Sequence, residues 1–514
     1  MDRAARGGPS VRDAGGALGL TVREIRDRAE RFHAAVLEEM FDGMSGRKPW
    51  PELEPLYATQ RLLAWEETAP AIERELAGAS GESERQLRRL LGWAGEHQVR
   101  SDNADLDDEY RMWHSTASVL LDETQVPVRR LDTMIESEPD RQARTRLADT
   151  RADAHSVIIP LQLDRLNRWR ISAEELGYGS HRQAVQRLSG VNLSATLREA
   201  RRLLSETQEL YEAELASQLS QHVRDVGEEA EAHDIEWLAR MDWLDLPCQE
   251  SSILETIRTD MAAIGLDLEE GGRVELKVEA FPGPGMNAFC SPIRVPNRVV
   301  LFVTPTVTPG SCRKLLWEIG ETVHWSRTDP SLPFEYRSIG DRSVAEAHGA
   351  LFANLALNPE WVRRARGIEG RQLEEYLRLA AFLDLYDLRR LAARLQFDLE
   401  VCESDRPGSL GARWAELMWD ATRVRHDPRE FLTRLGQRFG SARQLRARLL
   451  SAPLARVLEE RFDTDWFRNP RSGKFLGQWL AGGLSRDAAE LSELLGQPGL
   501  VVDPLVATVR DQLA

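Results

Sequence analysis

The stretch Leu315-Leu316-Trp317-Glu318-Ile319-Gly320-Glu321-Thr322-Val323-His324-Trp325 decides the fold of this chain, and it is predicted to form one helix. Successive residues of a helix are rotated by about 100°. Relative to Trp317, Glu321 therefore lies at about +40° and His324 at about −20°. Glu318 lies further round, at about +100°. The helix thus presents Trp317, Glu321 and His324 on one face.

The same helix contains the frame of a zinc motif in which two residues differ. In the pattern H-E-x-x-H, the two His residues are four apart and bind one zinc ion, while the Glu activates a water molecule. This chain has Trp317-Glu318-Ile319-Gly320-Glu321 in that frame. Glu318, in the position of the general base, is the one residue of the motif that is present.

Two further landmarks flank the helix. Glu346 follows Trp317 by 29 residues, within Val344-Ala345-Glu346-Ala347, and Gly285-Met286-Asn287-Ala288-Phe289-Cys290-Ser291-Pro292 precedes the helix. In this order and spacing, the landmarks resemble the thimet oligopeptidase and oligoendopeptidase families of gluzincin metallopeptidases, in which a Glu at the position of Glu346 is the third zinc ligand. The resemblance implies a mostly α-helical, bilobed oligopeptidase-like fold with a central cleft and a very small β-sheet.

A second departure concerns the oxyanion. These families carry Tyr residues in a C-terminal segment, roughly G-F-Y-x-A-x-Y, which donate hydrogen bonds to the oxyanion of the tetrahedral intermediate. The best local match is Phe439-Gly440-Ser441-Ala442-Arg443-Gln444, with Gly440 and Gln444 at the two Tyr positions. On this alignment, the zinc ligands and the oxyanion donors are lost together.

Composition limits the classes of partner and compartment. The 514 residues carry a net charge of −16, which disfavours nucleic acid because binding to phosphates needs clustered cations. The four Cys residues lie far apart, so a reducing compartment is expected, and we predict a cytoplasmic protein. No apolar run approaches the ~20 residues of a membrane helix. We therefore expect neither nucleic acid nor a membrane as a partner.

We divide the chain into a disordered tail (1–20), an N-terminal helical lobe (21–245) and a former catalytic lobe (246–514). Apolar residues at three- and four-residue steps predict helices from Val22 onward, including Leu106 to Leu121 and Leu197 to Leu219. The two convincing strands, Val274 to Ala280 and Val299 to Val303, are Val-rich and precede the 315–325 helix.

Four residues are the catalytic candidates: Glu318, Glu321, His324 and Glu346. Each also has an ordinary interpretation. Glu318 can be a helix Glu paired with Arg or Lys, Glu321 can pair with His324 at i, i+3, and His324 can be a structural, hydrogen-bonded His.

Trp317 is predicted to fill the volume of the metal or to form an aromatic wall for a ligand. Trp317, Tyr336 and His348 are the candidates for substrate binding.

A rearranged metal site is a further possibility, because Glu321, Glu346, His324 and His348 offer oxygen and nitrogen ligands. Replacing His by Glu shifts preference away from zinc toward harder ions. The E-x-x-H spacing of Glu321 and His324 lacks the matching second copy that a di-iron site needs. The prediction is no functional metal and no other cofactor.

The sequence favours the first of three functions, and the other two are alternatives. The first is a metal-independent acid/base enzyme, acting on a small-molecule or peptide-derived substrate bound in the central cleft. The second is a catalytically inactive pseudopeptidase that binds a peptide or protein. The third is a metallopeptidase with an unusual ligand set. A cleft plugged by Trp317 favours binding, whereas an open pocket on which Glu318, Glu321 and Glu346 converge favours chemistry.

Overall fold

The structure is a computed structural model that describes residues 20–223, 229–241, 244, 250–281, 288–305, 310–433, 435–436 and 438–514. Helices make up 71% of it and strands 6%. The first part of the chain contains α1 (Val22–Met44), α2 (Glu54–Ala58), α3 (Trp65–Leu76), α4 (Gly81–Asp102), α5 (Ala104–Thr116), β1 (Ser118–Leu121), β2 (Thr124–Pro127), α6 (Arg129–Ser137), α7 (Arg141–Ser156), α8 (Ile159–Glu175), α9 (His181–Ser189), α10 (Leu193–Glu206), α11 (Gln208–His222) and α12 (Ala232–Arg240).

The second part begins with a helix and a small sheet and is then helical to its end. Its elements are α13 (Glu250–Ala263), β3 (Val274–Val278), β4 (Ala288–Arg294), β5 (Arg298–Val303), α14 (Cys312–Arg327), α15 (Phe334–Arg337), α16 (Ser343–Ala353), α17 (Pro359–Arg366), α18 (Gly370–Glu403), α19 (Gly411–Thr422), α20 (Gly440–Phe462), α21 (Pro470–Ala481), α22 (Ala488–Leu494) and α23 (Asp503–Leu513).

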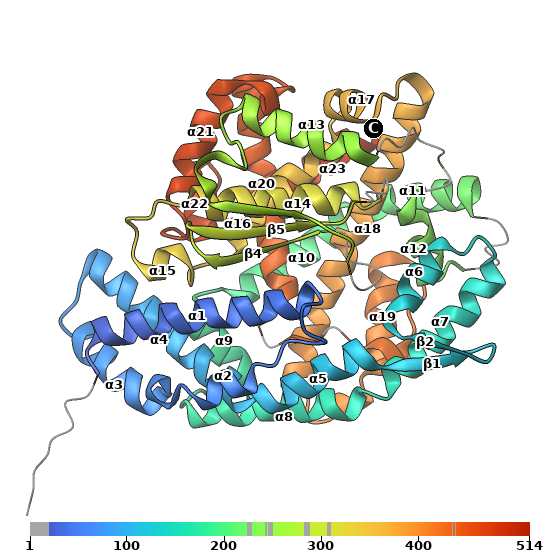
Figure 1. The fold of residues 1–514 in the computed structure, drawn as a ribbon. Coiled ribbons are helices and arrows are strands. Elements are labelled where there is room, and N and C mark those ends of the chain that lie inside the picture. The colour runs from blue at the N-terminus through green and yellow to red at the C-terminus, as the bar shows by residue number, and fades with distance from the viewer. Residues whose placement is uncertain are drawn as a thin grey trace, which may run out of the picture.

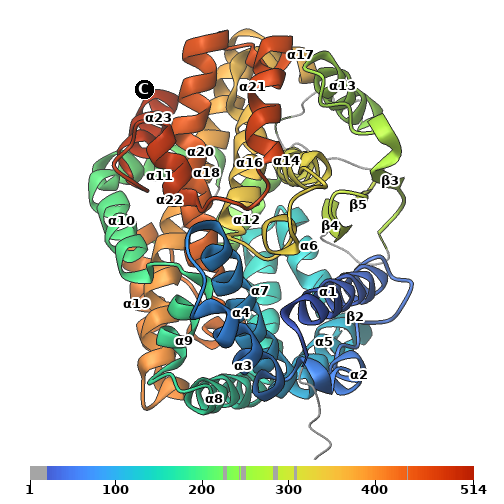
Figure 2. The same ribbon diagram turned by 90° about the vertical axis from the view of Figure 1, so that its left-hand side faces the viewer.

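A three-stranded sheet lies between α1 and α14 (Figures 1 and 2). Its strand order is β3-β5-β4, with β3 parallel and β4 antiparallel to β5. Side chains alternate between the two faces of a strand. Phe289 and Phe302 stack at a centroid distance of 5.2 Å and pack with Phe41 of α1. Leu301 belongs instead to the core cluster that contains Leu315 of α14, which packs against β5. Apolar contacts on both faces therefore fix α14 against the sheet.

Two glycines allow α14 and α16 to approach closely. A Cβ added at Gly320 of α14 would stand 2.3 Å from the carbonyl oxygen of His348. A Cβ added at Gly349 of α16 would stand 2.9 Å from Nε1 of Trp317. Only glycine, which has no Cβ, fits at these two positions. The helix α20 also packs against α16. The three helices α14, α16 and α20 thus form the block that carries the candidate site.

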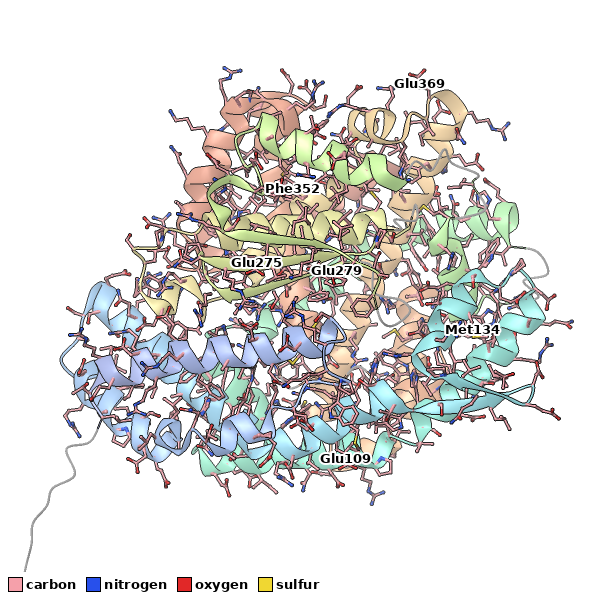
Figure 3. The ribbon with its side chains drawn as sticks, viewed as in Figure 1. Glu109, Met134, Glu275, Glu279, Phe352 and Glu369 are labelled. Atoms are coloured by element: carbon pink, nitrogen blue, oxygen red, sulfur yellow. The ribbon has the colours of Figure 1, made fainter. Side chains whose placement is uncertain are left out.

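Side chains fill the spaces between the elements (Figure 3). Phe352 of α16 is fully buried, with its ring centroid 5.9 Å from that of Trp466. Glu109 and Glu369, in contrast, are exposed at the outer surface. In the described part of the chain, no helix has the length and apolar character to cross a membrane.

Two predicted helices are wrong in detail. The helix expected from Leu106 to Leu121 ends at Thr116, and β1 follows. The chain reverses there because Asp122 and Glu123 adopt positive φ angles, which lets β1 pair with β2. The helix expected from Leu197 to Leu219 is interrupted at Thr207, whose hydroxyl donates to the carbonyl oxygen of Leu203.

The remaining predictions of organisation have different outcomes. Strands are found at Val274–Val278 and Arg298–Val303, close to the predicted ranges, and β4 accompanies them. Of the predicted tail, residues 1–19 lie outside the described part of the chain, as do residues 285–287 of the landmark before the zinc helix. The boundary at residues 245 and 246 stays a prediction.

Candidate functional site

Glu318 lies on the side of α14 that faces the edge strand β4. Its Oε2 accepts a hydrogen bond of 2.8 Å from the backbone N–H of Cys290, and its Oε1 forms an ion pair with Lys314, one turn earlier. The residue is only 6% exposed. Burial raises the pKa of Glu318 to about 7, although Lys314 acts in the opposite direction. This carboxyl therefore titrates near neutral pH.

Trp317 and Glu321 interact with each other. Nε1 of Trp317 donates a hydrogen bond of 2.8 Å to Oε1 of Glu321, one turn later. The indole fits because Gly349 of α16 has no side chain at this point. The half-buried Trp317 thus occupies the first ligand position of the zinc-motif frame, and Glu321, at the second ligand position, accepts its hydrogen bond.

Glu346 is held by the third helix of the block. Nε of Arg443 in α20 donates to Oε1 of Glu346 at 2.6 Å, while the buried Oε2 has no partner in the described part of the chain. Burial raises the pKa of the Glu346 carboxyl, and Arg443 opposes this effect. Glu321 also acts on this pKa, which shows that the carboxylates of Glu321 and Glu346 belong to one electrostatic cluster.

His324 and His348 form a buried pair between α14 and α16. Their ring centroids are 5.1 Å apart, and their exposed fractions are 0% and 1%. Nδ1 of His348 donates to the carbonyl oxygen of Val344 at 2.9 Å, whereas neither ring nitrogen of His324 has a partner among the described residues. Burial lowers the pKa of His348 to about 4 and holds that of His324 well below 6.5. Both rings are neutral at pH 7.

Tyr336 belongs to a different environment. Its ring lies under the guanidinium of Arg89 from α4, at 4.7 Å from the ring centroid, and it is 2% exposed. Burial raises the pKa of the Tyr336 phenol. The contacts of this residue thus join the segment after α14 to the N-terminal helices, and they do not include the carboxylates of α14 and α16.

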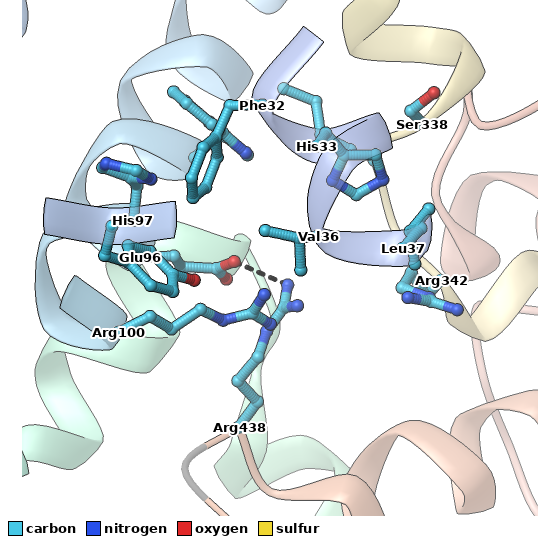
Figure 4. Close-up of a pocket in the computed structure, with 14 residues that line it drawn as sticks. Phe32, His33, Val36, Leu37, Glu96, His97, Arg100, Ser338, Arg342 and Arg438 are labelled. Carbon is cyan, nitrogen blue, oxygen red and sulfur yellow. Dashed lines mark ion pairs between the residues drawn. The ribbon is translucent and has the colours of Figure 1, made fainter. Parts of the chain in front are cut away.

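A pocket of about 70 Å³, partly open to solvent, lies between α1, α4, the segment before α16 and the segment before α20 (Figure 4). Its lining residues are Phe32, His33, Val36, Leu37, Tyr57, Trp93, Glu96, His97, Arg100, Ser338, Ile339, Gly340, Arg342 and Arg438. Glu318, Glu321 and Glu346 are not among them. Arg342 connects the pocket to these carboxylates, because Glu321 and Glu346 both raise the pKa of Arg342, which burial lowers.

The zinc ion that the family resemblance implies does not fit the residues at its three ligand positions. Nε1 of Trp317 carries a hydrogen and has no lone pair to give to a metal. Glu321 accepts that hydrogen, and Glu346 is paired with Arg443. Throughout the described ranges, no group of three or more His, Cys, Asp or Glu side chains could hold a metal ion.

Sequence reasoning missed Lys314, Arg342 and Arg443. Lys314 had a local signal, because it precedes Glu318 by one helical turn. Arg443 lies inside the segment that resembles the oxyanion Tyr region, yet its partner is 97 residues away in the chain. Arg342 lacks a carboxylate partner among the described residues, so no pairing pattern could have indicated it.

Comparisons with known proteins agree with the fold. No protein-family model matches the chain, and no curated protein matches it in sequence. The structure is similar to that of a protein assigned as oligoendopeptidase F, with a TM-score of 0.72, 15% identity, and coverage of 96% of this chain and 91% of that one. It is also similar to PZ peptidase A with an inhibitor, with a TM-score of 0.63, 13% identity, and coverage of 95% and 96%.

The predicted mostly helical, oligopeptidase-like fold is thereby confirmed. At these levels of identity, the likeness defines the fold and leaves the activity open. The function must therefore be argued from the site itself.

Proposed function

We propose that this chain is a pseudopeptidase of oligopeptidase-like fold, which binds a peptide or a peptide-like small molecule without hydrolysing it. The observation that carries the proposal is that internal partners occupy the residues at all three zinc-ligand positions. Trp317 is bonded to Glu321, and Glu346 is paired with Arg443. A zinc peptidase needs these positions free to hold the ion that activates water.

Charge balance supports this proposal. A zinc ion beside Glu346 would stand close to the guanidinium of Arg443, which already neutralises that carboxylate at 2.6 Å. The like charges would repel each other beside the buried Glu346, where only the Arg443 side chain, at 33% exposed, has access to water. The segment that resembles the oxyanion Tyr region thus contributes a cation that competes with the metal.

A metal-independent acid/base enzyme is the second candidate, and Glu318 favours it. A general acid or base works best when its pKa lies near the working pH, and the pKa of Glu318 is about 7. Against this candidate, both carboxylate oxygens of Glu318 are already bonded, to Lys314 and to Cys290 N–H. Glu318 also does not line the pocket.

The test is a paired measurement of binding and chemistry on one peptide library. The protein is incubated with the library in the presence of zinc, in the presence of a chelator and without either, and products are identified by mass spectrometry. Retained peptides are identified from the same samples after separation of bound from free. We expect retained peptides and no products in all three conditions.

Two other outcomes would replace the proposal. Cleavage that the chelator abolishes would indicate a metallopeptidase with an unusual ligand set. A chemically altered ligand in the chelator sample, absent with Glu318→Gln, would indicate the acid/base enzyme. Glu84→Gln, at a partly exposed position on α4, is the matched control because it removes the same charge far from the block.

A further inference from the structure

Three arginine residues line the pocket between the N-terminal helices and the helix block. Arg100 comes from α4, Arg342 from the start of α16 and Arg438 from the segment before α20. Figure 4 shows the guanidinium groups of Arg100 and Arg438 side by side, with Arg342 across the open space from them. All three act on the same ring, since each lowers the pKa of His33. All three positive charges therefore lie within electrostatic reach of His33.

The pocket contains fewer negative than positive charges. Glu96 is its one acidic lining residue, and it pairs with Arg438 at 2.6 Å. Across the described ranges, no carboxylate lies within ion-pair distance of Arg100 or Arg342, and Nε of Arg342 is buried without a partner. This is unusual in a chain with 83 acidic and 67 basic residues. Arg100 and Arg342 thus have no ion-pair partner among the described residues, although Glu321 and Glu346 act on Arg342 from a longer distance and its guanidinium lies 5.7 Å from the centroid of the Trp325 ring.

The two histidines of the pocket do not change its charge. Burial lowers the pKa of His33 and of His97 to about 3, so both rings are neutral at pH 7. Burial, together with the nearby Arg100 and Arg342, lowers the pKa of Arg438 to about 10, although Glu96 acts in the opposite direction. Mutual repulsion of this kind is relieved when an anion binds between the guanidinium groups.

The rest of the lining is apolar and aromatic. Phe32, Val36 and Leu37 of α1 face the space, together with Tyr57 and Trp93. The rings of Phe32 and Tyr57 lie edge to face at a centroid distance of 5.0 Å. A ligand held at the arginines would place its neighbouring atoms against this wall, where burial of apolar surface stabilises binding.

We propose that this pocket binds the carboxylate of a ligand whose adjacent group is apolar or aromatic, with Arg100 and Arg342 as the anion-binding residues. The proposal rests on the proposed function, since it names the ligand class of that binding protein. A free aromatic acid and the C-terminal carboxylate of a peptide share this chemistry. The forked N–H groups of arginine match the two oxygens of a carboxylate.

The test is calorimetric titration of the full chain with four probes. The probes are N-acetylphenylalanine, its amide, an N-acetylated tetrapeptide that ends in phenylalanine, and inorganic phosphate. We expect the acids to bind at least ~10-fold more tightly than the amide. Tighter binding of the tetrapeptide than of the single residue would identify a peptide terminus, and the reverse would identify a free acid. Both results support the carboxylate site.

Variants locate the site. Arg100→Gln and Arg342→Gln leave no carboxylate orphaned, so both should fold, and each should weaken binding of the acid at least ~10-fold. Arg100→Lys keeps the charge, removes the fork, and should bind with intermediate affinity. Arg88→Gln, on the exposed side of α4, is the matched control and should bind like the wild type within about 2-fold.

Several results would overturn the inference. These are equal affinity for acid and amide, preference for phosphate, wild-type affinity in Arg100→Gln and Arg342→Gln, or no binding of any probe. The proposed function is tested separately, because peptides retained from the library would still support it after any of these results. Conversion of a bound acid to a product would refute the proposed function while leaving the carboxylate site supported.

Discussion

Gly320→Ala tests whether α14 and α16 approach as closely as the site requires. The new Cβ would stand 2.3 Å from the carbonyl oxygen of His348, whereas ordinary contacts begin at 3.4 Å. The helices would have to separate by about 1 Å, and the obstacle is backbone, which cannot rotate away. Overpacking of this kind costs roughly 1–3 kcal/mol, and a backbone obstacle places the cost near the upper limit.

Helix propensity opposes this cost. Replacing a helical Gly by Ala favours the folded state by about 1 kcal/mol, so we expect a net loss of about 2 kcal/mol for Gly320→Ala. Gly477→Ala in α21 is the matched control, because a Cβ there meets nothing within 4 Å. It should gain up to about 1 kcal/mol from propensity alone.

The assay is urea unfolding followed by far-UV circular dichroism and tryptophan fluorescence at fixed pH and protein concentration. The midpoints of the two variants should move in opposite directions with unchanged slope, because the exposed surface is the same. A Gly320→Ala variant as stable as the Gly477→Ala control would refute the close approach of α14 and α16. The placement of Trp317 against Gly349 would then lose its basis as well.

Three further predictions concern the charged cluster. Burial raises the pKa of Glu318 from 4.5 to about 7, so between these pH values the folded state keeps a proton that the unfolded state loses. In urea melts, the stability of the wild type should therefore fall relative to that of Glu318→Gln as the pH rises from 4.5 to 7. A stability difference that stays constant over this range would contradict the raised pKa. Arg443→Met should lower the free energy of unfolding by about 2 kcal/mol, which is less than the loss of a fully buried ion pair because the Arg443 side chain is 33% exposed. The double variant with Glu346→Gln should recover most of this stability. If the double variant is as unstable as Arg443→Met, the broken ion pair is not the cause of the loss. Adding zinc, and then a chelator, should leave the thermal unfolding midpoint of the wild type unchanged. A shift of several degrees would reveal a bound ion, because zinc at 100 times its Kd would add about 2.7 kcal/mol to the free energy of unfolding.

The fold could be predicted because its signals are local or repeat along the chain. Apolar periodicity indicated the helices, and Val-rich runs indicated β3 and β5 close to their observed ranges. The errors occur where a short local interaction overrides the periodicity, as with the positive φ angles of Asp122 and Glu123. The hairpin that follows α5 carries an apolar pattern that a helix could also have used.

The candidate site could be predicted only along one helix. Helical spacing placed Trp317, Glu321 and His324 on one face, and in the structure that face meets α16 through the Trp317–Gly349 and His324–His348 contacts. The partners from other helices could not be predicted, because nothing local relates Arg443 to Glu346. The role of Glu346 therefore depends on a contact that only the folded chain provides.

Restoring the zinc motif on α14 should not by itself restore a tight zinc site. Trp317→His with Glu321→His supplies H-E-x-x-H, but Glu346 stays paired with Arg443 at 2.6 Å. Adding Arg443→Met frees the carboxylate and removes a competing cation. We expect the triple variant to bind zinc at least ~10-fold more tightly than the double variant, because changes around metal ligands typically alter metal affinity about 10–100-fold. Zinc affinity is measured by competition with a coloured chelator.

The matched control for that experiment is Arg456→Met, an exposed change on the same helix α20, added to the double variant in place of Arg443→Met. It removes one positive charge from the helix without touching Glu346, and so it should leave zinc affinity at the level of the double variant. If the double and triple variants bind zinc equally well, Arg443 does not withhold Glu346 from the metal. The Arg443–Glu346 pair would then no longer support the proposal of a binding protein without zinc chemistry. The two substitutions Trp317→His and Glu321→His would be enough to turn this site into a metal site.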